Sequence, residues 1–307
     1  MIVFTICSNN YLAQALTLGE SLIRFNSEYR FIIGLVDRKS RDIDLNIPYE
    51  IIEVEDLKIP GFNDMIFRYN IIELNTAVKP FYFNYLFEKY NATEIVYLDP
   101  DIQVFTPLTG LENELKNYDI IITPHITMPL NDHKTQFEED FLNSGLYNLG
   151  FIAIKNSQTG KNMIQWWGNR LRYKAFIDFK HGLFTDQIWI NFVPLFFENV
   201  KIYTNPGYNL AYWNLHERVL TKKGNRYFIN SSYPLVFYHF SGYDPLNPEI
   251  MSRYQDRFSF DNKPDLKPLF NDYSQLLFKN DFNNLINHQC YYIKVKEDMI
   301  KNNNLKK

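Results

Sequence analysis

The first hundred residues alternate between short apolar runs and segments with the apolar spacing of a helix. Apolar residues recur at helical spacing from Leu12 to Ile23, and helical patterns return over 65–74 and 77–90. The runs predicted to be strands lie at 2–7, 31–36, 50–54 and 94–98. This βαβ rhythm predicts an α/β fold, with a mainly parallel sheet covered by helices on both faces.

Beyond residue 100 the pattern is looser. Residues 127–144 are polar and predict a loop, while helices are predicted around Trp166-Trp167 and over 185–197. Further strands are predicted at 119–122, 149–154 and 235–239. The sequence has no internal repeat and no obvious linker. We therefore predict one main domain over 1–247, followed by a helical extension and basic tail over 248–307.

Composition bears on the location of the protein. The chain has 307 residues and 46% hydrophobic content, enough for a large core. No apolar run approaches the roughly 18 residues of a membrane-spanning helix. The start of the chain lacks the basic region of a signal peptide. The two cysteines, Cys7 and Cys290, suggest reduced thiols rather than a disulfide framework. We therefore expect a cytoplasmic protein.

The charge balance argues against a nucleic-acid partner. The net charge is −3, with 32 basic and 35 acidic residues. The end of the chain is locally basic, through Lys294, Lys296, Lys301, Lys306 and Lys307. Such a tail can contact anionic lipid at about 1 kcal/mol per residue, although solvated chain ends are commoner. Peripheral contact with the inner face of a membrane is the minority hypothesis.

Asp99-Pro100-Asp101 is the strongest single motif. In extended backbone, residues two apart point to the same side, so both carboxylates can reach one ion. The pair follows a predicted strand, where open α/β sheets bind their ligands. Hard oxygen ligands suit Mg²⁺ or Mn²⁺. The bland alternative is that the two aspartates cap a turn, which is common for such a short motif.

A phosphatase of the haloacid dehalogenase type also has two aspartates after a strand. That motif lies near the N-terminus, whereas this pair lies a third of the way along the chain. Where that motif carries Thr or Val, this chain has Gln103. We therefore set the phosphatase hypothesis aside.

Four segments together resemble the GT-A glycosyltransferases, particularly the family-8-like retaining galactosyl- and glucosyltransferases. The segments are Tyr97-Leu98-Asp99-Pro100-Asp101-Ile102, Tyr147-Asn148-Leu149-Gly150-Phe151, Thr185-Asp186-Gln187-Ile188-Trp189-Ile190-Asn191 and His239-Phe240-Ser241-Gly242. Each is short, but their order and approximate spacing agree with the family over roughly residues 1 to 245. The resemblance implies a GT-A fold and a nucleotide-sugar donor.

The resemblance also implies how the donor diphosphate is held. His239 would be the third metal ligand beside Asp99 and Asp101, although by residue type alone a structural histidine is the commoner case. Gly242 would let backbone approach the phosphates. The family has a phosphate-contacting lysine shortly afterwards, where this chain has Tyr243-Asp244-Pro245. That lysine is therefore missing from its expected place.

Further donor contacts are implied elsewhere. Lys79 precedes Pro80 at a position where the family often has a basic residue, but a solvated surface lysine is about equally expected. The nucleotide would lie at the exit of the first strand, with Tyr11 stacking on the base or, alternatively, filling the core. The residues implied for this nucleotide site are Thr5, Ser8, Asn9, Tyr11 and Asp37.

Asp186 and Gln187 bear on mechanism. In retaining relatives the aspartate binds donor-sugar hydroxyls and the glutamine amide lies beneath the anomeric carbon, while Asn148 contacts the sugars. A neutral amide is a poor nucleophile, which favours front-face transfer with retention. An inverting enzyme would need a base, and the polar loop offers His133, Glu139 and Asp140. By residue type alone, Asp186 could instead cap a helix.

Two other classes of function are weighed. A carbohydrate-binding protein that lost activity would not need the complete set of metal ligands. A nucleotidyltransferase needs a glycine-rich, basic loop after the first strand, but this chain has Ser8-Asn9-Asn10-Tyr11 there. We therefore favour a transferase, with UDP-galactose or UDP-glucose as the donor usual in the family. A glycan or lipid-linked acceptor is expected by analogy alone.

Overall fold

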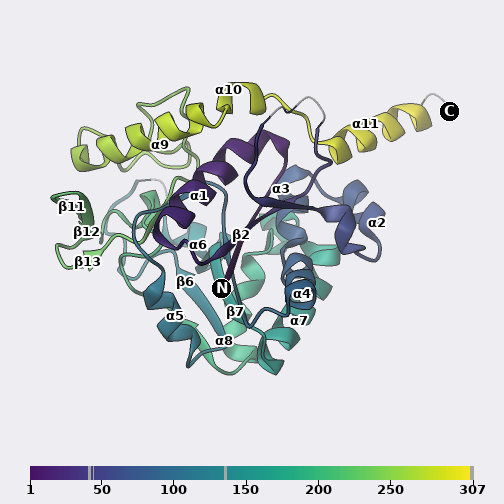
Figure 1. Cartoon of the computed structure of the whole chain (residues 1–307), viewed down its shortest axis with the longest axis horizontal. Helices are drawn as coiled ribbons and strands as arrows, with labels where there is room; N and C mark the ends of the chain where they lie inside the picture. The colour runs from purple at the N-terminus through teal and green to yellow at the C-terminus, as the bar shows by residue number, and fades with distance from the viewer. Residues whose placement is uncertain (41–42, 44, 135–136, 305–307) are drawn as a thin grey trace.

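The computed structural model describes residues 1–40, 43, 45–134 and 137–304. Its centre is a seven-stranded sheet in the order β10-β6-β7-β4-β1-β2-β3 (Figure 1). Strand β7 is antiparallel to β4 and β6, and the other neighbours are parallel. The strands are β1 (Ile2–Cys7), β2 (Arg30–Leu35), β3 (Glu50–Glu53), β4 (Glu94–Leu98), β6 (Ile120–Pro124), β7 (Tyr147–Lys155) and β10 (Val200–Ile202). The predicted α/β class and mainly parallel sheet are confirmed.

Both faces of the sheet are buried. In β1, Val3 and Cys7 point into one apolar cluster, while Phe4 and Ile6 point into another on the opposite face. The first cluster includes residues of α1 (Leu12–Phe25) and α5 (Thr109–Leu115). The second includes residues of α2 (Phe62–Arg68), α3 (Ile71–Ala77), α4 (Lys79–Tyr90) and α7 (Gln158–Lys174). Helices on both faces explain why the strands are continuous apolar runs.

The helix predicted over 65–74 is two helices, α2 and α3. Asn70 adopts extended backbone between them, and its side chain accepts a hydrogen bond from Glu73 N. The Glu73 carboxylate in turn accepts one from Asn70 N at 2.9 Å. This capping box starts a new helix in a stretch whose apolar periodicity looks uninterrupted.

The polar segment predicted as a loop contains a helix, α6 (Glu138–Ser144). Its first turn carries Glu138, Glu139 and Asp140, and the Asp140 carboxylate accepts a hydrogen bond from Phe137 N at 2.9 Å. Acidic side chains stabilise the positive end of a helix, which explains a helix in so polar a stretch. The prediction of a loop throughout 127–144 was therefore wrong.

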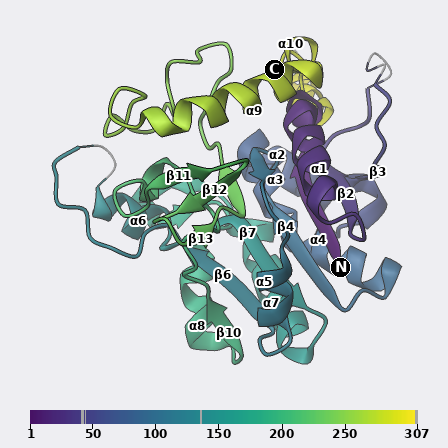
Figure 2. The same cartoon turned by 60° about the vertical axis from the view of Figure 1, so that its left-hand side comes forward.

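Several short elements surround the sheet. The predicted helix over 185–197 is a 3₁₀ helix, η4 (Ile188–Phe192), followed by one turn of α8 (Val193–Phe196). The predicted strand at 235–239 is β14 (Phe237–His239), which pairs antiparallel with β5 (Ile102–Val104) outside the main sheet. The remaining strands are β8 (Ile177–Asp178), β9 (Leu183–Phe184), β11 (Leu220–Lys223), β12 (Arg226–Ile229) and β13 (Tyr233–Pro234). Figure 2 shows β11 to β13 beneath α9.

The C-terminal segment packs against the sheet domain. Helix α9 (Lys267–Lys279) packs across α1 (Figures 1 and 2), and its Phe270 and Tyr273 join the same apolar cluster as β1. Two further helices follow, α10 (Phe282–Leu285) and α11 (Tyr291–Asn304). Lys296 of α11 donates a hydrogen bond to Tyr69 O at 2.9 Å. Lys306 and Lys307 of the predicted basic tail lie outside the described residues.

The described helices include none that is long and apolar enough to cross a membrane. Cys7 and Cys290 are both buried free thiols, as predicted. Burial raises the pKa of Cys290 to about 11, so this thiol is inert at neutral pH.

Candidate functional site

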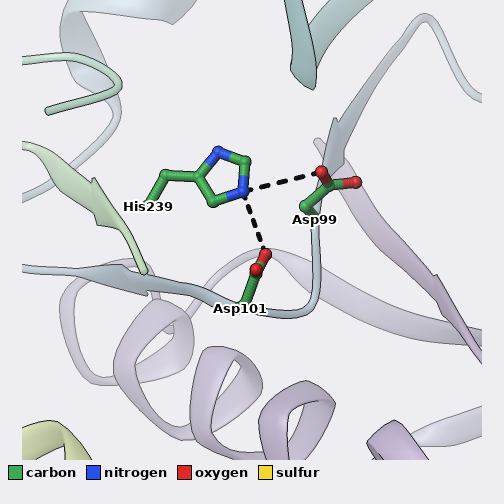
Figure 3. Close-up of side chains that lie close together, drawn as sticks. All are labelled: Asp99, Asp101 and His239. Atoms are coloured by element: carbon green, nitrogen blue, oxygen red, sulfur yellow. Dashed lines mark ion pairs between the residues drawn. The ribbon is translucent and has the colours of Figure 1, made fainter. Parts of the chain in front are cut away.

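Asp99, Asp101 and His239 come together at one edge of the sheet (Figure 3). His239 Nε2 lies 3.0 Å from Asp101 Oδ1 and 3.7 Å from Asp99 Oδ2. Each residue offers one ligand atom, and these atoms all lie within 4.8 Å of one another. Two carboxylates and one imidazole suit Mn²⁺ or Mg²⁺ and leave coordination positions for other oxygens, so the residues fit a divalent cation.

Backbone contacts hold the three side chains in place. Asp99 follows β4, and its N–H donates a hydrogen bond to Gly150 O of β7 at 2.8 Å. Pairing of β5 with β14 sets His239 opposite Ile102, directly after Asp101. A Cβ atom on Gly150 would lie 2.4 Å from the His239 ring, so only glycine fits beside the imidazole.

Burial and neighbouring charges shift the pKa values of Asp99 and His239 in opposite directions. Burial raises the pKa of Asp99, while Lys79 and His239 lower it. Burial lowers the pKa of His239, but the Asp101 and Asp99 carboxylates outweigh burial and the net shift is upward. The Asp99 and Asp101 carboxylates therefore favour a positive charge beside them.

Lys79 and Asp186 form a buried ion pair. Lys79 Nζ lies 2.6 Å from Asp186 Oδ2, and the two side chains are 2% and 3% exposed. Lys79 Nζ also donates to Leu149 O at 2.9 Å and lies 4.0 Å from the Tyr97 ring centroid. The Tyr97 hydroxyl in turn donates to Asp99 Oδ1 at 2.5 Å. Lys79 is therefore not a solvated surface residue. It contacts both Asp186 and Tyr97, and Tyr97 in turn donates a hydrogen bond to Asp99.

Gln187 is fixed by two backbone groups. Its Oε1 accepts a hydrogen bond from Leu149 N at 3.1 Å, and its Nε2 donates to Ser144 O at 2.8 Å. Asn148 lies next to this contact and accepts hydrogen bonds from Gly150 N and Asn209 Nδ2. The two amides therefore stand in defined orientations beside β7.

Sequence reasoning missed three neighbours of the site, His125, Asn209 and Trp213. The Trp213 ring packs edge-on against both His125 and His239, with centroids 5.3 and 5.2 Å away. His125 Nε2 lies 3.3 Å from Asn148 Nδ2. His125 follows β6 at the sheet edge where Asp99 follows β4, and that position was a usable signal. Asn209 lies in a loop and Trp213 in the short 3₁₀ helix η5 (Tyr212–Asn214), and neither position has a sequence signal.

The residues expected at the nucleotide make internal hydrogen bonds at the ends of β1 and β2. Asp37 is buried and accepts from the backbone N–H groups of Asn9, Arg38 and Tyr291. Ser8 Oγ donates to Val36 O, and the Asn9 amide donates to Arg38 O. Thr5 is fully buried within β1. None of these contacts bears on nucleotide binding, which stays a prediction.

Tyr11 and Gly242 are the other two residues predicted to contact the donor. Burial raises the pKa of Tyr11 to about 12, and Asp101 adds to the effect. Gly242 has a φ of +73°, which favours glycine. Of the alternative bases, His133 and Glu139 are exposed, and Asp140 caps α6.

The fold is that of the GT-A glycosyltransferases. The galactosyltransferase LgtC, solved in complex with donor and acceptor sugar analogs, superposes with a TM-score of 0.51 and 16% identity, over 90% of this chain and 95% of that one. The WbbM bifunctional glycosyltransferase gives a TM-score of 0.52 and 13% identity, over 91% of this chain and 51% of that one. The GT-A prediction is confirmed at the level of fold.

Two proteins of Bacillus subtilis (strain 168) are similar in sequence, and both are uncharacterised. YfnF is 27% identical over 251 residues, which span 78% of this chain and 80% of YfnF. YfnD is 22% identical over 245 residues, which span 78% of this chain and 76% of YfnD. No family model matches the sequence.

Proposed function

We propose that the chain is a metal-dependent glycosyltransferase that moves a hexose from a nucleotide diphosphate sugar to a glycan or glycolipid acceptor. The observation that carries the proposal is the convergence of Asp99, Asp101 and His239 at a sheet edge of a GT-A fold. These residues would hold Mn²⁺ or Mg²⁺, which supplies positive charge to the diphosphate. UDP-galactose and UDP-glucose are the first donors to test.

The donor sugar would lie where β7 contacts the 185–187 turn through the hydrogen bond from Leu149 N to Gln187 Oε1. Lys79 Nζ lies 2.6 Å from Asp186 Oδ2 and fixes the carboxylate, which can accept hydrogen bonds from sugar hydroxyls. Asn148 and Gln187 present amides beside it. Lys79, Asp186, Asn148 and Gln187 are all buried, so a sugar bound against them would be shielded from water.

Transfer with retention is the stereochemistry we propose. The Gln187 amide is neutral and held by two backbone hydrogen bonds, so it can orient a sugar but is a poor nucleophile. Front-face attack then leaves the departing diphosphate to take the acceptor proton. Asp140, which an inverting mechanism could use as a base, is already hydrogen-bonded to Phe137 N at the start of α6.

We also propose a cytoplasmic location, with α11 meeting the inner face of a membrane where a lipid-linked acceptor is presented. Lys294 and Lys301 of α11 can contact anionic headgroups, whereas Lys296 is hydrogen-bonded to Tyr69 O. Cosedimentation with anionic vesicles, compared between the full chain and a Lys294→Gln/Lys301→Gln variant, tests this location.

Donor hydrolysis tests the function without knowledge of the acceptor. UDP-, GDP- and dTDP-sugars are incubated with Mn²⁺ or with chelator, and the released nucleoside diphosphate is measured. We expect metal-dependent release from one sugar nucleotide, with the first-formed anomer seen by NMR matching the donor. If none is bound or hydrolysed with metal present, the chain is a carbohydrate-binding protein on a GT-A fold and the proposal fails.

A further inference from the structure

A diphosphate at the proposed donor site needs positive charge on the side away from the divalent cation as well. Lys79 is 2.6 Å from Asp186, and the pair is buried, so its charge is already balanced. A divalent cation held by Asp99 and Asp101 is likewise balanced by its two ligands. A diphosphate that joins this group brings at least about two further negative charges, which need another cation nearby. The segment Tyr243-Asp244-Pro245 after Gly242 supplies none.

The chain returns to Gly242 a loop later and places Arg253 there. Arg253 N donates a hydrogen bond to Gly242 O at 3.1 Å. A Cβ atom on Gly242 would lie 2.6 Å from the Tyr254 ring and 2.7 Å from Ser252 Oγ. Ser252, Arg253 and Tyr254 therefore pack closely on Gly242. Since Phe240 N donates to Asp101 O at 2.8 Å, this segment is tied to the backbone of a metal-ligand candidate.

The Arg253 guanidinium is held by the neighbouring Tyr254 side chain. Its Nη2 donates to the Tyr254 hydroxyl at 2.9 Å, and its Cζ lies 5.0 Å from the Tyr254 ring centroid. Within the described part of the chain, no carboxylate oxygen lies within 4.0 Å of it. Asp244 interacts with it only at longer range. The Arg253 side chain is exposed, so its guanidinium can bind an anion from solution.

Tyr11 relates the guanidinium to the metal-ligand candidates. Burial raises the pKa of Tyr11 to about 12; Asp101 adds to this rise and Arg253 opposes it. The Tyr11 hydroxyl therefore lies in the electrostatic fields of both Asp101 and Arg253. A diphosphate bound through a cation on Asp99 and Asp101 would also lie in the field of the Arg253 guanidinium.

We propose that Arg253 binds the donor diphosphate on the side opposite the divalent cation, in place of the lysine that the segment after Gly242 lacks. The inference rests on the proposed function. The planar guanidinium can donate two parallel hydrogen bonds to phosphate oxygens, which a lysine cannot. The loop from Gly242 to Arg253 thus carries a specificity-determining residue for nucleoside diphosphates.

Titration calorimetry with uridine, UMP and UDP in the presence of Mn²⁺ tests this assignment, with GDP and dTDP as parallel probes. We expect Arg253→Gln to weaken nucleoside diphosphate binding about tenfold or more, with nucleoside binding unchanged. Arg253→Lys should fall between the two. Arg226→Gln is the matched control, because Arg226 is an exposed arginine on β12. In donor hydrolysis, Arg253→Gln should lower kcat as well as raise KM.

The outcomes separate the two proposals. If wild type binds a nucleoside diphosphate with Mn²⁺ and Arg253→Gln binds it equally well, the Arg253 assignment fails while the proposed function stands. If Arg253→Gln weakens nucleoside and diphosphate binding alike, the residue acts on loop structure and the assignment also fails. If wild type binds no nucleoside diphosphate with Mn²⁺, the proposed function itself fails.

Discussion

At the scale of single residues, the site depends on charged and polar groups that are buried in pairs. A charge removed from water is tolerated only while its partner remains, so losing one partner costs more than the pair contributes. The Lys79–Asp186 pair is the clearest case, because both side chains are almost fully buried. Burial likewise disfavours the charged form of the His125 imidazole and lowers its pKa.

Lys79→Met should destabilise the fold by about 3–5 kcal/mol, because it leaves Asp186 buried without a counter-charge. Urea unfolding at pH 7 measures the change. Lys89→Met is the matched control: Lys89 pairs with Glu50 at 3.0 Å, but the two side chains are 38% and 32% exposed, so about 0–1 kcal/mol is expected. Equal losses for the two variants would contradict the buried-pair account.

His125 should make stability fall in mild acid. Burial lowers the pKa of His125 to about 4, so the unfolded chain, with an ordinary pKa of about 6.5, binds more protons between these values. The contribution of His125 to the free energy of unfolding is therefore fully present above pH 6.5 and is lost as the pH falls toward 4. From pH 7 to pH 5 this group contributes a loss of about 2 kcal/mol. Urea unfolding of His125→Gln at both pH values should show a smaller loss, and an unchanged loss would refute the assignment.

At the scale of elements, close approach between strands positions the site. Strand β7 passes beside the end of β14 at Gly150, where no side chain fits next to His239. The β4–β7 pairing then aligns Asp99 with the same point, since Asp99 N bonds to Gly150 O. The position of the imidazole is therefore set by the backbone of a neighbouring strand.

Gly150→Ala should displace the His239 ring and weaken Mn²⁺ binding about tenfold or more, because the added Cβ would lie 2.4 Å from it. Titration calorimetry with Mn²⁺ measures the effect. Gly168→Ala is the control. Gly168 lies in α7, and an added Cβ would meet the Phe81 ring of α4 at an ordinary contact distance of 3.6 Å. Because alanine favours a helix more than glycine does, the free energy of unfolding should rise by up to about 1 kcal/mol. Unchanged Mn²⁺ affinity in Gly150→Ala would show that the imidazole is not a ligand.

The helices and strands that could be predicted from the sequence are those marked by a clear pattern of apolar residues. The continuous apolar runs at 2–7 and 94–98 became β1 and β4 with the same bounds. The break between α2 and α3 and the start of α6 depend on side-chain caps at Asn70 and Asp140, which apolar periodicity does not register. The convergence of the three metal-ligand candidates was suggested by motif order, whereas Asn209 and Trp213 reach the site through tertiary packing alone.

At the scale of the whole molecule, the C-terminal helices complete the core of the sheet domain. Phe270 and Tyr273 of α9 join the cluster of β1 and α1, and Phe240 stacks on Tyr273 with centroids 3.8 Å apart. On the other face, Cys290 and Tyr292 join the second cluster. Residues 248–304 therefore contribute apolar side chains to both faces of the sheet.

A chain ending at residue 247 should accordingly fail to fold. Its loss exposes the apolar face of α1 and removes large buried aromatics, each of which costs about 3–5 kcal/mol when truncated alone, against a total stability of about 5–15 kcal/mol. We expect the full chain to unfold in a single calorimetric transition. A dispersed NMR spectrum from the 1–247 fragment would instead establish the boundary at 247 as that of an independent domain.

The central claim is that Asp99, Asp101 and His239 hold a divalent cation for a nucleoside diphosphate. The most direct measurement is Mn²⁺ binding by electron paramagnetic resonance, with and without UDP, for wild type, Asp101→Asn and the exposed control Asp272→Asn. We predict that wild type and Asp272→Asn bind Mn²⁺ more tightly with UDP present, and that Asp101→Asn loses both the binding and the enhancement. Equal Mn²⁺ binding by Asp101→Asn and wild type would contradict the account.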